Sequence, residues 1–153
     1  MLSLSIIIPC YNVEAYLPKT IFSLSQLNNA DNCEFIFIND GSTDCTGSII
    51  ENFVRNEKRA IGITQVNKGV SAARNAGIAI AQGDYILCLD GDDYLQADSL
   101  DIITQGLQDA DALIAPCIID NLSGTISPEK LAIKAGIYTV DQLYSSCEVF
   151  PTA

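Results

Sequence analysis

Short apolar runs alternate with helix-like periods along most of this chain. Apolar runs of strand length, as found in parallel sheets covered on both faces, occur at Leu4 to Ile8, Phe35 to Ile38, Ile61 to Val66, Tyr85 to Leu89 and Ala112 to Ile119. Helical periods occur at Val13 to Leu27, Thr43 to Asn56, Gly69 to Ala81 and Ala97 to Gln108. This alternation predicts an α/β fold with an open, mainly parallel sheet and helices on both faces. In such a fold ligands bind at the carboxyl ends of the strands.

Polar residues and one proline indicate where the first two helices begin. Asn12 is placed to cap the first helix, and Pro18 predicts a new first turn, because a proline deeper inside a helix costs about 3 kcal/mol. Ser42 or Thr43 is expected to cap the second helix. Asp44 would then lie in its first turn, near the positive end of the helix dipole.

The charge balance excludes several classes of function. The 153 residues include 8 Lys and Arg, 19 Asp and Glu and no histidine, which gives a net charge of −11. Such an acidic surface opposes attraction to phosphate backbones, so nucleic acid is not expected as a partner. The lack of histidine removes Ser-His-Asp and Cys-His catalysis and histidine metal sites. Carboxylates, hydroxyls, thiols and a bound metal remain as chemistry.

The cysteines and the first residues predict a cytoplasmic protein. The six cysteines form no CxxC pair, and we interpret them as buried, reduced thiols. Met1 leads directly into an apolar run that ends at Pro9, unlike a signal peptide. No run approaches the ~20 apolar residues of a membrane span, so no integral membrane segment is expected.

Three carboxylates directly follow the fourth expected strand. Asp90, Asp92 and Asp93 lie within four residues and should repel one another. A hard cation relieves this repulsion, and oxygen ligands of this kind suit Mg²⁺ or Mn²⁺ with positions left for phosphate oxygens. A solvated turn before a helix also explains the triplet. Its place at the end of a strand favours a ligand site.

Three other residues have both a functional and a simpler structural interpretation. Asp40 could belong to a common Asp-Gly-Ser turn, or it could accept the N3–H of a uracil ring with Tyr11 packed on the base. Taken alone, a tyrosine such as Tyr11 more often packs in the core. Arg74 lies among small residues, where its guanidinium suits a diphosphate or simply neutralises nearby acids. The glycine motifs GxGxxG and GxxxxGK[ST] are absent, which disfavours dinucleotide-binding and P-loop proteins.

Four segments in order carry a resemblance to a known family. PCYN, NDGSTD, NKGVSAARNAG and GDYILCLDGDD resemble the nucleotide-binding half of a family 2 glycosyltransferase with the GT-A fold, and the likeness runs from Leu4 to about Leu95. The resemblance implies a UDP-sugar or similar nucleotide-sugar donor, a divalent Mn²⁺ or Mg²⁺ ion and inversion at the anomeric carbon. It also implies a saccharide or lipid-linked acceptor.

The resemblance also implies roles for single residues. On the nucleoside side, Pro9 and Tyr11, with Asn12 beside them, would line the pocket, and Asp40 would bind the base.

On the phosphate side, the resemblance matches Asp90, Gly91 and Asp92 to the family's DxD motif. Asp90 would face the ribose and Asp92 would hold the metal, with Asp90 and Asp93 as further metal candidates. Lys68, Arg74 and Asn75 match the NxGxxxARN block, in which Arg74 is our candidate for the diphosphate.

The general base expected from the family is not recognisable in the rest of the chain. The acids beyond the fifth strand match no such motif, and Asp120, which follows a strand, is the only candidate. We therefore expect residues 1–119 to form the nucleotide-sugar-binding domain and 120–153 to begin a truncated acceptor-side region. Asp120 to Gly124 predicts a hairpin turn, and Val140 to Cys147 predicts a short helix.

Two alternatives to a glycosyltransferase stay open. One is a donor-binding module without transfer activity, because the base is missing. The other is a nucleotidyltransferase of related fold, but PCYN does not supply the glycine-rich, basic phosphate loop that it would need. The usual setting of the family is polysaccharide synthesis at the inner face of a membrane. Peripheral membrane association fits that setting, although no basic amphipathic helix supports it.

Overall fold

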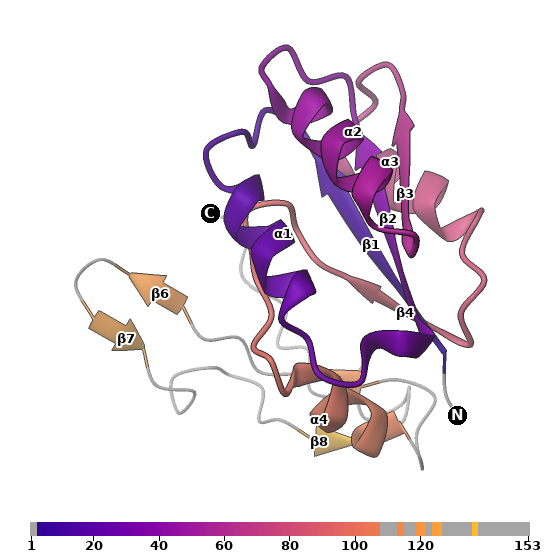
Figure 1. The fold of residues 1–153 in the computed structure, drawn as a ribbon, viewed down its shortest axis with the longest axis vertical. Helices are drawn as coiled ribbons and strands as arrows, with labels where there is room; N and C mark the ends of the chain where they lie inside the picture. The colour runs from indigo at the N-terminus through magenta and orange to yellow at the C-terminus, as the bar shows by residue number, and fades with distance from the viewer. Residues whose placement is uncertain (1–2, 108–112, 115–118, 122–123, 127–135, 138–153) are drawn as a thin grey trace, which may run out of the picture. The chain divides into compact units, whose positions relative to one another are not determined.

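The computed structural model of this chain describes residues 3–107, 113–114, 119–121, 124–126 and 136–137 (Figure 1). The chain forms two units, Met1–Leu100 and Asp101–Ala153. The boundary expected from the sequence, between a donor-binding region (1–119) and an acceptor-side region (120–153), concerns function and stays a prediction.

The first unit contains a four-stranded, fully parallel sheet with the strand order β3-β2-β1-β4. Its strands are β1 (Leu4–Cys10), β2 (Cys33–Asn39), β3 (Ala60–Thr64) and β4 (Tyr85–Cys88). The register pairs Cys10 with Asn39 and Asn39 with Thr64, so β1, β2 and β3 end level with one another. The predicted α/β class with an open parallel sheet is confirmed. The loops after these strands meet at one edge.

Helices pack on both faces of this sheet, as predicted (Figure 1). They are α1 (Leu17–Ser25), α2 (Thr46–Asn56) and α3 (Val70–Ile78), and a short 3₁₀ helix spans Ala30–Asn32. A further helix, α4 (Ser99–Gly106), crosses the boundary between the two units. Alternate residues of a strand point to opposite faces. Ile6 and Ile8 therefore share a buried cluster with Leu17 of α1 and Ile50 of α2, whereas Ile7 packs with Ala73 of α3.

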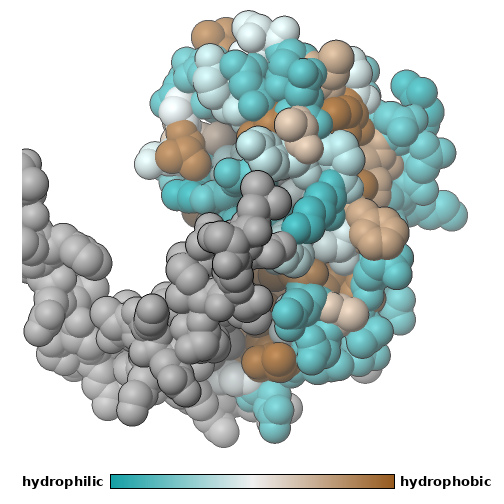
Figure 2. Space-filling view, turned by 90° about the vertical axis from the view of Figure 1, so that its left-hand side faces the viewer, coloured by the Kyte–Doolittle hydropathy of each residue, from teal (hydrophilic) through white to brown (hydrophobic). Residues whose placement is uncertain are grey.

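Burial of the strands differs between the middle and the edges of the sheet. Every residue of β1 is buried, and so are the last five residues of β2. The expectation that strands are covered on both faces is wrong for β3, which is exposed at Ile61, Gly62 and Thr64, and for β4, where exposed residues alternate with half-buried ones. These two strands lie at the edges of the described sheet, where fewer neighbours cover them. On the face shown in Figure 2, exposed apolar side chains form small patches among hydrophilic side chains.

The first two helices begin later than predicted. Pro18 does lie in the first turn of α1. Asn12 does not cap that helix, because it precedes Leu17 by five residues and its side chain bonds to the loop after β2 instead. The caps expected at Ser42 or Thr43 are also wrong, because α2 begins after Cys45, and Asp44 precedes the helix rather than lying in its first turn.

In the second unit the described strands are short and antiparallel. β5 (Leu113–Ile114) pairs with β8 (Gly136–Ile137), and β6 (Ile119–Asn121) pairs with β7 (Gly124–Ile126). The fifth parallel strand predicted over Ala112 to Ile119 is therefore wrong. That run contains Pro116, which has no N–H for a continuous ladder.

The pairing of β6 with β7 confirms the hairpin predicted near Asp120 to Gly124. The short helix predicted at Val140 to Cys147 lies outside the described residues.

Cysteine exposure partly contradicts the sequence interpretation. Cys10 is buried and Cys33 is half-buried, but Cys45 and Cys88 are exposed, and all four are free thiols. Cys45 lies in a loop and Cys88 on an edge strand, which explains their exposure. Among the described residues, no helix has the length and apolar character needed to span a membrane.

Candidate functional site

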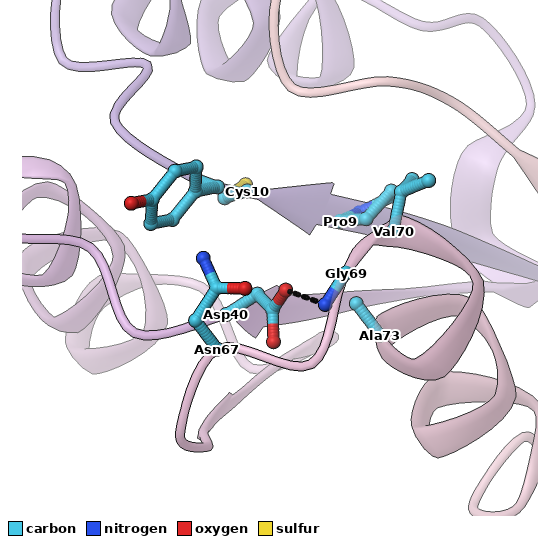
Figure 3. Close-up of a pocket in the computed structure, with 8 residues that line it drawn as sticks. Pro9, Cys10, Asp40, Asn67, Gly69, Val70 and Ala73 are labelled. Atoms are coloured by element: carbon cyan, nitrogen blue, oxygen red, sulfur yellow. Dashed lines mark hydrogen bonds between the residues drawn. The ribbon is translucent and has the colours of Figure 1, made fainter.

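A cavity of about 300 Å³ opens at the carboxyl ends of β1 and β2 (Figure 3). Residues after β1, β2 and β3 and at the start of α3 meet there, as the level strand ends require. The lining residues are Pro9, Cys10, Tyr11, Asp40, Asn67, Gly69, Val70 and Ala73. Three residues expected in a nucleoside pocket, Pro9, Tyr11 and Asp40, thus lie around one cavity.

Asp40 is a buried carboxylate with three hydrogen bonds. Its Oδ1 accepts from Gln65 Nε2 at 2.7 Å and from the backbone N–H of Lys68 at 2.9 Å. Its Oδ2 accepts from the backbone N–H of Gly69 at 2.8 Å, and Figure 3 shows this bond. Burial alone would raise the pKa of Asp40, but these hydrogen bonds outweigh burial and lower its pKa. Asp40 is therefore a fixed, ionised acceptor.

The geometry of Asp40 leaves room for one more donor. A carboxylate offers about four acceptor positions, and three are used here. By this count one acceptor position remains, on a carboxylate that lines the cavity. Asp40 is thus more than a turn residue, because its side chain joins β2 to the loop between β3 and α3.

Tyr11 and Asn12 leave the end of β1 in an exposed loop. Tyr11 is 50% exposed and lines the cavity, so core packing does not explain it. Asn12 has φ 52°, in the left-handed region. Its Oδ1 accepts from the backbone N–H of Thr43 at 2.8 Å, and its own N–H donates to Ser42 Oγ at 3.1 Å. Asn12 thereby fastens the loop that carries Tyr11 to the loop after β2.

The acidic residues after β4 form a tight turn. The backbone N–H of Asp93 donates to the carbonyl oxygen of Asp90 at 3.0 Å, with Gly91 and Asp92 between them. A Cβ atom at Gly91 would lie 3.0 Å from Cys10 Sγ, so the turn packs closely on the end of β1. Burial, and next the charge of Asp92, raise the pKa of Cys10 to about 12. The turn and the cavity therefore share Cys10.

The carboxylates of this turn are open rather than gathered into a closed site. Asp92 and Asp93 are exposed. Partial desolvation, with repulsion from Asp92 and Asp90, raises the pKa of Asp93. Within the described part of the chain, no three acidic or cysteine side chains form a ready cluster for a metal ion.

Arg74 of α3 bonds to the same turn. Its Nη2 donates to Asp90 Oδ1 at 2.6 Å, and the two side chains are 35% and 47% exposed. The hydrogen bond and then the charge of Asp90 raise the pKa of Arg74. The Nε atom of Arg74 is buried without a hydrogen-bond partner. Of the other residues in the predicted block, Lys68 contributes its backbone N–H to Asp40, and Asn75 is exposed on α3.

Several lining residues had no role in the sequence interpretation. Asn67, Gly69, Val70 and Ala73 all belong to the quoted segment NKGVSAARNAG, and the last two lie in the first turns of α3, which begins inside that segment. Gln65 was placed inside a strand that in fact ends at Thr64. The signal available in the sequence for the loop between β3 and α3 was the run of polar residues that follows the apolar run of β3.

Asp120 lies in β6 of the second unit. Its role as a general base stays a prediction.

A parallel sheet in the order 3-2-1-4 with a cavity at its carboxyl end is typical of Rossmann-like α/β domains, which bind ligands at that edge. Within that class, residues 5–145 match the profile of the family described as Glycosyl transferase family 2, and the chain belongs to this family.

Relatives and solved structures agree with the family. The chain is 48% identical over 100 residues to an "Uncharacterized glycosyltransferase" of Haemophilus influenzae, covering 64% of this chain and 39% of that protein. It is 39% identical over 113 residues to "Uncharacterized glycosyltransferase EpsJ" of Bacillus subtilis, covering 74% and 33%. The structure of S. aureus TarS 1–349 in complex with UDP-GlcNAc matches with 28% identity and a TM-score of 0.65, covering 71% and 32%. The chain thus spans between about a third and two fifths of these proteins.

Proposed function

We propose that residues 1–119 form the donor-binding part of a metal-dependent, inverting glycosyltransferase that uses a nucleoside diphosphate sugar, with UDP as the nucleotide. The observation that carries this proposal is the position of the ionised Asp40 in a cavity that shares Cys10 with the acidic turn. The family and the UDP-GlcNAc complex of TarS support the same donor class.

The nucleoside would occupy the cavity. Asp40 would accept the N3–H of uracil at its remaining acceptor position, since uracil presents a donor there. Tyr11, half exposed at the rim, would pack against the base, and Pro9 and Asn67 would complete the walls. The backbone bonds from Lys68 and Gly69 keep Asp40 fixed before the ligand arrives.

The diphosphate would lie beside Arg74 and the acidic turn to which Arg74 bonds. Asp92 would hold a Mn²⁺ or Mg²⁺ ion, with Asp90 and Asp93 as further ligands. Their exposed hard oxygen atoms fit such an ion, and the lack of a closed cluster fits one completed by phosphate oxygens. When bound, the ion would neutralise negative charge on the leaving diphosphate. Arg74 would add a second positive charge through the N–H groups that do not bond Asp90.

Transfer also needs a base for the acceptor hydroxyl. The acceptor would be a saccharide or a lipid-linked saccharide, used at the cytoplasmic face of a membrane, and residues 120–153 would begin the region that binds it. Asp120 is the candidate base. The second candidate function is a donor-binding module without transfer. It is favoured by Asp40 being the sole carboxylate that lines the described cavity, where it already accepts three hydrogen bonds.

Calorimetric titration with UDP, with and without Mn²⁺, tests the donor site. We expect Mn²⁺ to strengthen UDP binding, and Asp92→Asn to abolish this gain. Asp98→Asn is the matched control, because it removes the charge of an exposed acid outside the turn. Equal gains in Asp92→Asn and the control would contradict the metal role. Turnover of UDP-sugars with a panel of saccharide acceptors would exclude the binding-only module.

A further inference from the structure

Helix α1 carries two polar side chains on its buried face. Thr20 is fully buried and Ser23 is 8% exposed, on the side of the helix that buries Leu17 and Leu24. Buried hydroxyl groups cost free energy unless they are hydrogen-bonded, so their partners indicate why they are there. Neither residue belongs to the four segments that carry the family resemblance.

Both hydroxyl groups bond to the backbone of the segment after β4. Thr20 Oγ1 donates to the carbonyl oxygen of Gly91 at 3.0 Å. Ser23 Oγ accepts from the backbone N–H of Leu95 at 3.3 Å and donates to the Thr20 carbonyl oxygen at 2.7 Å. Helix α1 is therefore bonded to this segment at both ends of the stretch that includes Asp92 and Asp93.

A third contact from the same helix lies between these two bonds. Lys19 Nζ is 3.8 Å from the centre of the Tyr94 ring, within the range of a cation–π interaction. From its other side, the turn packs against the end of β1. A Cβ atom at Gly91 would lie 3.1 Å from the Pro9 carbonyl oxygen and 3.2 Å from Val13 Cγ2. The acidic turn is thus held between α1 and β1.

We propose that Thr20 is a positioning residue for the divalent ion, because its hydroxyl group fixes the Gly91 carbonyl and hence the turn from which Asp92 acts. This inference rests on the proposed function, since it requires Asp92 to hold the ion. Residues behind metal ligands keep those ligands in a binding geometry, and their loss typically weakens metal binding about 10- to 100-fold. Thr20 acts through one backbone bond, so we expect the lower end of this range.

The test compares Thr20→Val with Thr20→Ser in the full chain. Valine keeps the branched shape but removes the hydroxyl group, whereas serine keeps the hydroxyl group. Two quantities are measured: the affinity for UDP alone by calorimetry, and the affinity of the UDP-bound protein for Mn²⁺ by electron paramagnetic resonance. Ser25→Ala is the control, because Ser25 is an exposed residue of α1 that bonds only within its own helix turn in the described contacts.

We expect Thr20→Val to weaken Mn²⁺ binding roughly tenfold with unchanged affinity for UDP alone. Thr20→Ser and Ser25→Ala should bind Mn²⁺ like the unaltered chain. Wild-type Mn²⁺ affinity in a folded Thr20→Val would overturn the inference. The proposed function fails in a different way, namely when the unaltered chain and Asp92→Asn bind Mn²⁺ equally.

A second variant decides the matter if Thr20→Val does not fold. Thr20→Ala removes the same hydroxyl group and its bond to Gly91, and leaves no branched side chain to accommodate at this buried position. Weaker Mn²⁺ binding by Thr20→Ala, with unchanged affinity for UDP alone, would support positioning by Thr20. Mn²⁺ binding equal to that of the unaltered chain would contradict it.

Discussion

Arg74 Nη2 lies 2.6 Å from Asp90 Oδ1 and joins helix α3 to the acidic turn after β4. Both residues were expected to face the donor, and in the structure they bond to each other. The pair is partly exposed, so its own contribution to stability is small. For donor binding, the pair would hold the positive guanidinium of Arg74 beside carboxylates that otherwise repel an anionic ligand.

Arg74→Lys should weaken UDP binding about tenfold, because lysine lacks the planar fork that bonds Asp90 and a phosphate together. Arg55→Lys is the control, since Arg55 is exposed in the last turn of α2. Calorimetry in the presence of Mn²⁺ measures both variants. Equal UDP affinities in the two variants would count against a role for Arg74 in binding the diphosphate.

Removing the Gln65 amide, which donates a hydrogen bond to Asp40, should change how the free energy of unfolding depends on pH. The native pKa of Asp40 is lower than its ordinary value of 3.8. Its ionised form therefore stabilises the fold above that value, and this stabilisation is lost as the pH falls through the lower native pKa. Lys68 is the charged neighbour that acts in the same direction.

Gln65→Leu removes the hydrogen bond of 2.7 Å to Asp40. We expect the free energy of unfolding at pH 7 to fall by about 1 kcal/mol and its decline in acid to become shallower. Urea unfolding at a series of pH values measures this. Gln82→Leu, at an exposed glutamine, is the control. Parallel curves for Gln65→Leu and the unaltered chain would show that the bond does not support the charge of Asp40.

Two substitutions at Asn12 separate backbone strain from hydrogen bonding. Asn12→Ala loses the bond to Thr43 and leaves at φ 52° a residue that tolerates the left-handed region less well than asparagine, so it should cost about 2 kcal/mol in total. Asn12→Gly loses the same bond without that strain, so it should cost about 1 kcal/mol less. Thermal and urea unfolding measure the two losses. Equal losses would mean that the left-handed backbone contributes nothing to the choice of asparagine.

Gly91→Ala should disturb the acidic turn by crowding. Its Cβ atom would lie 3.0 to 3.2 Å from Cys10 Sγ, the Pro9 carbonyl oxygen and Val13 Cγ2. We expect a loss of about 1 to 3 kcal/mol in the free energy of unfolding. Adding Cys10→Ala removes the closest of these atoms and should recover part of the loss. An unchanged unfolding free energy in Gly91→Ala would contradict the close packing of the turn.

The sequence predicts the sheet well because its signal is strong there. The continuous apolar runs of β1 and β2 belong to strands buried on both faces, and the turn residues that follow mark the ligand edge. The exposure of β3 and β4 was missed, because strand order depends on pairings that hydrophobic periodicity does not encode. The start of α1 was missed because Asn12 bonds to another loop instead of to its own helix.

For the site, the family resemblance identified Pro9, Tyr11 and Asp40 as residues of one pocket, and they do share a cavity. The sequence could not show that Gln65 and the loop after it hold Asp40, because those bonds join segments about 25 residues apart. Nor could it show that Thr20 supports the acidic turn, since a threonine on an apolar helix face has no periodic signature.

The central claim is that the loops after β1, β2 and β3 and the turn after β4 form one donor site. Nitrogen-15 NMR of the chain, titrated with UDP and then with Mn²⁺, tests it most directly. We predict that UDP shifts the amide signals of Tyr11, Asp40 and Gly69, and that Mn²⁺ then broadens signals around Asp92 most strongly. Shifts confined to another surface, or Mn²⁺ broadening centred away from Asp92, would contradict the claim.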